Sequence, residues 1–171
     1  MVEDEAMVVV GIDPGIARTG YGFVRLTEAG ILEAIAYGVI ETPAGQPLGT
    51  RLRQLYKMLN GLLLLHNPSF GAVEKLFFQR NVRTAMMVGQ ARGVAMLALA
   101  ESDLNVAEYT PGEIKQAVTG YGAADKRQMQ LMTAAVLNLG AIPEPDDAAD
   151  ALAVAVCHIH SSRINNLERL Q

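Results

Sequence analysis

Apolar residues in the first part of this chain fall into short runs of the kind that form strands. Residues 7–13 (MVVVGID) are short, rich in β-branched side chains and followed by the turn signal Pro14-Gly15, which is typical of a buried strand. Residues 20–26 and 30–43 predict two more strands, joined by a turn near Glu28 to Gly30. Together the three runs predict an antiparallel meander.

Further along the chain, helical and strand patterns alternate. Residues 47–66 carry leucines at helical spacing and predict a helix. Thr110 is a candidate N-cap, since Pro111 follows at the first helical position and Glu113 stands three residues on. The remaining expected elements are strands in residues 69–76 and 105–109 and helices over residues 82–101, 110–118, 126–137 and 147–162.

This order of elements predicts an α/β fold with a mixed five-stranded sheet and helices packed on it. The chain contains no internal repeat and no low-complexity linker, so we expect one domain over residues 1–171. Residues 1–6 (MVEDEA) would be an unstructured extension if Met7 is the start of the fold.

Composition favours a globular cytoplasmic protein. Half of the 171 residues are hydrophobic, which is enough for a substantial core. No uninterrupted apolar stretch reaches the ~18 residues of a membrane helix, and the acidic N-terminus is unlike a signal peptide. Cys157 is the single cysteine, which excludes an intramolecular disulfide, fits a reducing compartment and is typical of core packing in an apolar helix.

Net charge argues against a nucleic-acid partner, but the distribution of charge weakens that argument. The formal net charge is −4. Basic residues nevertheless cluster in two stretches, which predicts locally positive surfaces. These residues are Lys75, Arg80, Arg83 and Arg92, with no acid between them, and Arg51, Arg53 and Lys57 on one expected helix.

Acids stand where the pattern places the ends of buried elements. Asp13 ends the first strand and Glu74 ends the fourth, while Asp147 and Asp150 share one face of the last helix near its start. If the first and fourth strands are neighbours and the last helix packs across their ends, these four carboxylates converge within a few ångströms. Asp150 carries most weight, because a carboxylate in an alanine-rich face is costly to bury without a partner.

Converging carboxylates would repel one another unless a cation lay between them. Mg²⁺ and Mn²⁺ prefer such oxygen ligands, and two ions ~3.5 to 4 Å apart can promote in-line attack at a phosphodiester. Simpler readings stay open at this point. Asp146 and Asp147 could cap the helix, Asp13 could belong to an ordinary turn, and Glu74 could be exposed.

Five motifs, taken together, resemble the RuvC family of Holliday-junction resolvases. They are GIDPGIARTGYG, AVEKLFFQRN, GQARGVA, EIKQAVTGYGAADKRQM and DAADALAVAVCHIH, in the family's order and spacing between about Met7 and Ser162. The resemblance implies a ribonuclease-H-like fold and a homodimer that uses Mg²⁺ or Mn²⁺, with two ions per site, to nick a four-way DNA junction symmetrically. It also implies the RuvA and RuvB branch-migration proteins as partners in recombination and repair.

The resemblance gives roles to individual residues. The family's four catalytic carboxylates match Asp13, Glu74, Asp147 and Asp150. Its base-stacking aromatic matches Phe77, whereas we expect Phe78 to be core. Its basic residues match Lys115 and Lys126, for which an ordinary surface position is the alternative. Arg80 and Arg83 are candidates for contacts to the DNA backbone, and surface solvation explains them nearly as well.

Other features leave the function open. Gly15, Gly20 and Gly22 could let DNA or a metal approach Asp13, or could serve turns and strand twist. Gly89 and Gly93, one turn apart, suit a dimer contact or packing within the chain. His158 and His160 cannot share a helix face, so we expect both to be structural. A phosphotransferase of the actin and sugar-kinase type needs a second domain, while a junction-binding scaffold and an RNA-directed relative remain the other candidates.

Overall fold

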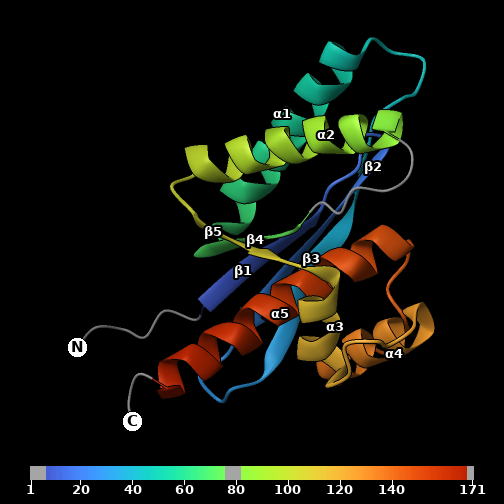
Figure 1. The fold of residues 1–171 in the computed structure, drawn as a ribbon. Helices are drawn as coiled ribbons and strands as arrows, with labels where there is room; N and C mark the ends of the chain where they lie inside the picture. The colour runs from blue at the N-terminus through green and yellow to red at the C-terminus, as the bar shows by residue number, and fades with distance from the viewer. Residues whose placement is uncertain (1–6, 76–81, 169–171) are drawn as a thin grey trace.

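The computed structural model describes residues 7–75 and 82–168, and these form a five-stranded sheet in the order β3-β2-β1-β4-β5 (Figure 1). The sheet is mixed, as the sequence predicts: β1, β2 and β3 form the antiparallel meander, and β4 and β5 run parallel to β1. The strands are β1 (Met7–Asp13), β2 (Arg18–Leu26), β3 (Leu32–Glu41), β4 (Phe70–Glu74) and β5 (Asn105–Tyr109).

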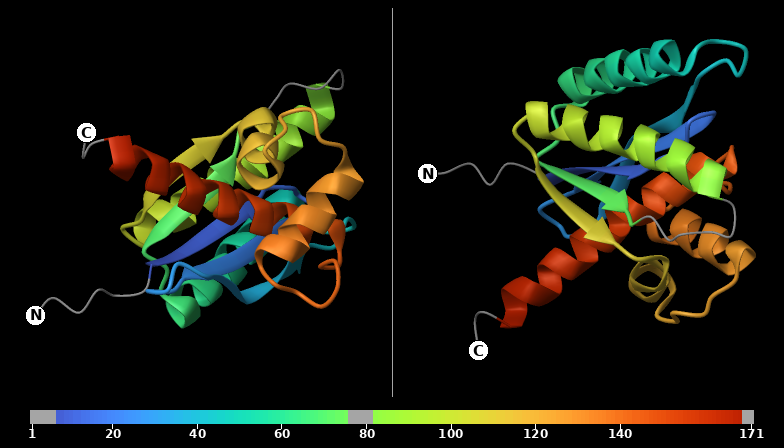
Figure 2. Two further views of the ribbon diagram at one scale, coloured as in Figure 1. Left: turned by 90° about the horizontal axis from the view of Figure 1, so that it is seen from below. Right: turned by 45° about the horizontal axis from the view of Figure 1, so that its top comes forward.

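Helices cover both faces of this sheet (Figures 1 and 2). Alternate residues along each strand serve the two faces: Val9 packs in the core beneath α5, whereas Val10 packs in the core beneath α1 and α2. Helices α3 and α4 join α5 on its side of the sheet. The helices are α1 (Leu48–His66), α2 (Val82–Glu101), α3 (Pro111–Thr119), α4 (Lys126–Val136) and α5 (Asp146–Glu168).

Close contact between α5 and the sheet depends on glycines in the strands. A Cβ added at Gly11 would lie 2.1 Å from the carbonyl oxygen of Ala151, and one added at Gly20 would lie 1.9 Å from that of Asp147. No side chain larger than hydrogen fits there without moving the helix. The glycines near Asp13 therefore serve helix packing at Gly20 and Gly22, where a Cβ would meet Leu152, rather than the approach of a ligand.

Most of the predicted boundaries agree with the structure to within a residue or two. The capping box of α3 is present: Thr110 Oγ1 accepts from the Glu113 backbone N–H at 3.2 Å, and Glu113 Oε2 accepts from the Thr110 backbone N–H at 2.7 Å. The prediction was wrong for α5, which ends at Glu168 and not near Ser162. Across residues 7–75 and 82–168, no helix is both long and apolar enough to cross a membrane.

The structure tests the predicted core position of Cys157 and the predicted surface position of Arg51. Cys157 is fully buried in α5, and burial raises the pKa of its thiol to about 11, which confirms the core role. Arg51 is only 6% exposed, so its assignment to a basic surface was wrong. Its guanidinium donates to Ile16 O at 3.1 Å and to Thr42 Oγ1 at 3.0 Å, and it thereby holds the loop that follows β1.

Candidate active site

Parallel pairing of β1 with β4 brings two of the predicted acids together. Ile12 is in register with Val73, so the next residues, Asp13 and Glu74, end neighbouring strands at the same edge of the sheet. The two carboxyl groups interact closely enough that Glu74 raises the pKa of Asp13. Two carboxylates this close repel each other unless one of them holds a proton or a cation lies between them.

The start of α5 brings the other two acids to this edge. Gly20 pairs with Asp13 across β1 and β2, and the Asp147 carbonyl lies directly against Gly20. Asp150 lies one turn further on, on the same face of the helix. The close packing of α5 on glycine thus fixes where the carboxylates of Asp147 and Asp150 face Asp13.

The carboxyl groups at this edge lie close enough to raise one another's pKa values. The pKa of Asp13 is raised to about 7, first by burial and then by repulsion from Glu74, Asp150 and Asp147. Burial is also the main cause of the raised pKa of Glu74, with repulsion from Asp150 second. The pKa of Asp150 is raised by burial, against the opposing effect of Lys126. Each of these shifts would be relieved by a cation among the carboxylates.

The four carboxylates nevertheless do not form a finished ligand set. Among the described residues, no group of three or more His, Cys, Asp or Glu side chains is gathered closely enough to hold one ion. The predicted convergence is therefore looser than expected: the acids share a site, but they are not drawn together around a common point. The four side chains are nevertheless oxygen donors of the kind that Mg²⁺ and Mn²⁺ prefer.

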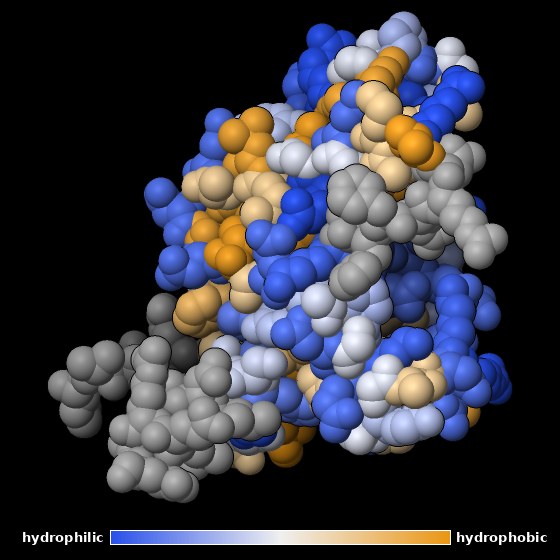
Figure 3. Space-filling model, in the orientation of Figure 1, coloured by the Kyte–Doolittle hydropathy of each residue, from blue (hydrophilic) through white to orange (hydrophobic). Residues whose placement is uncertain are grey.

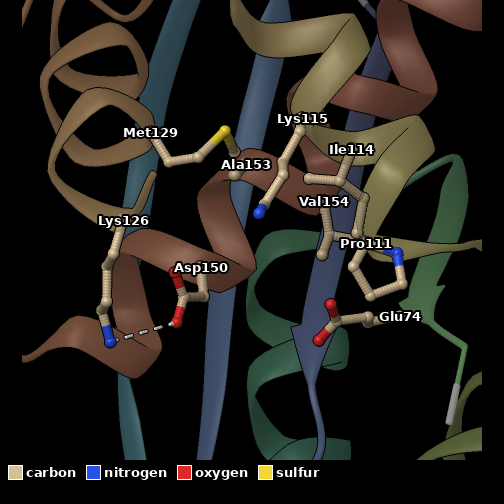
Figure 4. A pocket seen from close by; sticks show the side chains of 9 residues that line it. All are labelled: Glu74, Pro111, Ile114, Lys115, Lys126, Met129, Asp150, Ala153 and Val154. Carbon is tan, nitrogen blue, oxygen red and sulfur yellow. Dashed lines mark ion pairs between the residues drawn. The ribbon is translucent and has the colours of Figure 1, made fainter. Parts of the chain in front are cut away.

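A cavity of about 220 Å³ opens between Glu74 and Asp150 (Figure 4). Lys115 points its amino group from α3 into the space between these two acids, and Lys126 of α4 forms an ion pair with Asp150 at 3.9 Å. The rest of the lining is largely apolar and consists of Pro111, Ile114, Met129, Ala153 and Val154. Both lysines expected from the sequence thus lie at the acids, where they can contact a phosphate.

The other predicted DNA-binding residues are less informative. Arg83 is exposed in the first turn of α2. Phe77, Phe78 and Arg80 lie outside the described residues, so their predicted roles stay predictions.

Sequence reasoning missed two contacts at the site. Arg92, expected only as part of a basic stretch, donates to the Glu74 carbonyl at 3.5 Å and pairs with Glu108, so it braces the end of β4. Asp146, read from the sequence as a cap, lies in the first turn of α5, and its carboxylate also contacts Lys126 and Gln130 of α4. Neither contact follows from spacing along the chain, since both join elements that are distant in sequence.

The histidines are structural, as expected. His158 packs against the ring of Phe70, and its Nδ1 hydrogen-bonds with the Tyr109 hydroxyl at 2.9 Å. Burial lowers the pKa of His158, which favours the neutral ring. His160 Nδ1 bonds to the Ala117 carbonyl at 2.8 Å. Neither ring takes part in the acidic site.

Comparisons with known proteins agree with this architecture. The chain matches the family model described as crossover junction endodeoxyribonuclease RuvC over residues 9–158. A relative of that name from Syntrophomonas wolfei is 52% identical over 160 residues, which cover 94% of this chain and 92% of the relative.

Solved structures are similar as well. The structure of Thermus thermophilus RuvC has a TM-score of 0.86 and 35% identity, over 93% of this chain and 97% of that one. T. thermophilus RuvC in complex with Holliday junction substrate has a TM-score of 0.85 and 33% identity, over 92% of this chain and 96% of that one. The ribonuclease-H-like fold expected from the sequence is confirmed. The chain therefore belongs to the RuvC family of crossover junction endodeoxyribonucleases.

Proposed function

We propose that the protein is a structure-specific endonuclease that resolves four-way DNA junctions by hydrolysing phosphodiesters in two strands. The observation that carries this proposal is the group of interacting carboxylates at one edge of the sheet, with two lysines beside it. Acids alone would repel DNA, whereas acids that hold cations beside lysines can accept its backbone. Family membership supports a four-way junction as the substrate, because a related RuvC has been seen bound to Holliday junction substrate.

The cofactor we propose is Mg²⁺, with Mn²⁺ as a substitute and two ions per site. Asp13, Glu74, Asp147 and Asp150 would hold the ions. Bound ions of this kind supply an activated water and stabilise the leaving oxygen of a phosphodiester. The raised pKa of Asp13 supports the proposal, since a cation would relieve the repulsion that contributes to it.

Positive side chains around the acids are suited to the DNA backbone. Lys115 and Lys126 line the cavity itself, and Arg83 is exposed on α2. We assign these three to phosphate contacts, together with Arg80, and we assign Phe77 to base stacking at the opened centre of the junction. Stacking of a base on an aromatic ring is worth ~1 to 3 kcal/mol and tolerates any base.

A homodimer, with α2 as the contact, completes the proposal. Val82, Met86 and Leu97 are 71%, 62% and 52% exposed and lie along one face of α2 with Gly93. A Cβ at Gly93 would meet nothing within 4 Å, so packing within the described chain does not explain this glycine. In Figure 3 the hydrophobic surface lies mainly over α1 and α2, and the surface over α3 and α4 is mainly hydrophilic. A two-fold axis at α2 would give the dimer two symmetry-related active sites, one for each of the two DNA strands to be nicked.

Symmetric nicking by this dimer would follow branch migration by RuvA and RuvB in the cytoplasm. The buried, unpaired Cys157 is compatible with that reducing compartment.

One experiment tests the activity and its substrate together. The full chain is incubated with a labelled four-way junction, a linear duplex of the same sequence and an RNA–DNA hybrid, each with Mg²⁺ and with EDTA. We expect paired nicks in the junction with Mg²⁺ only. Cleavage of the hybrid in preference to the junction would instead indicate an RNA-directed relative, and junction binding without any cleavage would indicate a scaffold.

A further inference from the structure

Lys126 lies between two hollows of the surface and between two acids. Its side chain lines the 220 Å³ cavity beside Asp150 (Figure 4). It also lines a hollow of about 690 Å³ beside Asp146. The ammonium nitrogen is 2.7 Å from Asp146 Oδ2 but 3.9 Å from Asp150 Oδ2. The lysine therefore makes its close contact with Asp146, the acid outside the predicted ligand set.

Asp146 is held in a position that favours this contact. Its second oxygen, Oδ1, accepts a hydrogen bond from Gln130 Nε2 at 2.9 Å. Lys126 and Gln130 lie four residues apart on one face of α4, so a single carboxylate of α5 receives one donor from each. Both oxygens of Asp146 thus join the first turn of α5 to α4.

The consequence concerns Asp150. A lysine ammonium in direct contact with a carboxylate occupies the oxygens that a metal ion would use, and it repels that ion. In this structure the ammonium is in close contact with Asp146, so Asp150 has a positive neighbour that does not occupy its carboxylate oxygens. We infer that Asp146 is a positioning residue that holds Lys126 beside the site but off Asp150, so that Asp150 stays open to a cation. The inference rests on the proposed metal site and adds a residue that regulates its affinity.

A simpler explanation would be that Asp146 only adds negative charge. Glu144 offers a matched control for that explanation, because it is exposed, lines the same 690 Å³ hollow and forms no ion pair within the described residues. Loss of charge at Glu144 or at Asp146 should then have the same effect. If Asp146 acts through Lys126, its effect depends on the lysine being present, which a double-mutant cycle measures.

The test is Mn²⁺ binding to the full chain without DNA, followed by electron paramagnetic resonance of the free ion. We expect Asp146→Asn to weaken binding about threefold to fivefold, the upper end of the range for one partly exposed charge contact, because the freed lysine closes on Asp150. In a Lys126→Gln background the same substitution should change binding less than about twofold. Glu144→Gln should also change it less than about twofold, and Asp146→Glu should restore most of the affinity.

Three results would overturn the inference. If Asp146→Asn weakens Mn²⁺ binding equally with and without Lys126, Asp146 acts only through its negative charge. The same conclusion follows if Glu144→Gln weakens Mn²⁺ binding as much as Asp146→Asn does. Thermal denaturation of each variant checks that the fold is retained. If the Glu74→Gln variant binds Mn²⁺ as tightly as the unsubstituted chain does, the proposed metal site itself fails, and the inference fails with it. If Mn²⁺ binding depends on Glu74 but the effects of Asp146 and Lys126 are independent, the metal site stands and only the inference about Asp146 fails.

Discussion

Substitution of Gly20 by alanine should separate the carboxylates without removing any of them. The added Cβ would lie 1.9 Å from the Asp147 carbonyl oxygen and 2.6 Å from its carbonyl carbon. Both are backbone atoms in the first turn of α5, so no side-chain rotation relieves the contact. The helix start must move away from the sheet by about 1 Å to restore a contact of 3.0 Å.

That movement has two measurable costs. Overpacking of this kind typically costs ~1 to 3 kcal/mol of unfolding free energy, which corresponds to a melting temperature lower by roughly 2 to 12 °C in a chain of this size. A misplacement of about 1 Å at catalytic groups can lower a rate about 100-fold. Because Asp147 and Asp150 move together with the helix, we expect nicking to fall by about that factor at a temperature where the variant is still folded.

The assay compares melting by circular dichroism with the rate of junction nicking in Mg²⁺. Gly61→Ala is the control, since Gly61 is an exposed position inside α1 where a Cβ meets nothing within 4 Å. That variant should keep its activity and gain up to about 1 kcal/mol of stability, because alanine favours a helix. Unchanged melting and unchanged nicking in Gly20→Ala would refute the argument that this glycine sets the geometry of the site.

Three further predictions follow from single residues. Asp13 has a pKa of about 7 in the fold against an ordinary 3.8, so the folded chain holds a proton that the unfolded chain releases. Metal-free protein should therefore lose up to about 4 kcal/mol of stability as pH rises from 4 to 7, and in urea denaturation Asp13→Asn should show a smaller loss, since only the raised pKa values of Glu74 and Asp150 remain. Met86→Glu should convert a dimer to a monomer in sedimentation, whereas Leu64→Glu, at an 83% exposed position on α1, should not. Phe77→Ala should reduce junction opening, measured by 2-aminopurine fluorescence, more than it lowers melting temperature; a large fall in melting temperature would favour a core role.

Local sequence signals were sufficient for most of the fold. The run ending in Asp13 and the run ending in Glu74 are strands because β-branched and apolar residues are followed directly by turn or polar residues. Thr110 and Glu113 specify the start of α3 by themselves. The extension of α5 to Glu168 was missed, because Asn165 and Asn166, which have weak helix propensity, follow shortly after Ser162.

The candidate site was predictable as a set of residues but not as a geometry. Matched positions at strand ends identified Asp13 and Glu74, and helical spacing identified Asp147 and Asp150. Spacing along the chain could not show that Lys126 contacts Asp146 or that Arg51 is buried, because those contacts depend on how helices pack. It also could not show how closely the four carboxylates lie to one another, which depends on how α5 packs on the sheet.

The role of the carboxylates is tested most directly at Glu74, which can be changed to glutamine with almost no change in shape. Nicking of a labelled four-way junction in Mg²⁺ and binding of the same junction in EDTA are measured for Glu74→Gln, with Glu28→Gln as a control at an exposed turn position. We expect Glu74→Gln to bind the junction and melt like the unsubstituted protein while nicking is abolished, and Glu28→Gln to nick normally. Full Mg²⁺-dependent nicking by Glu74→Gln would contradict a catalytic metal site at this edge of the sheet.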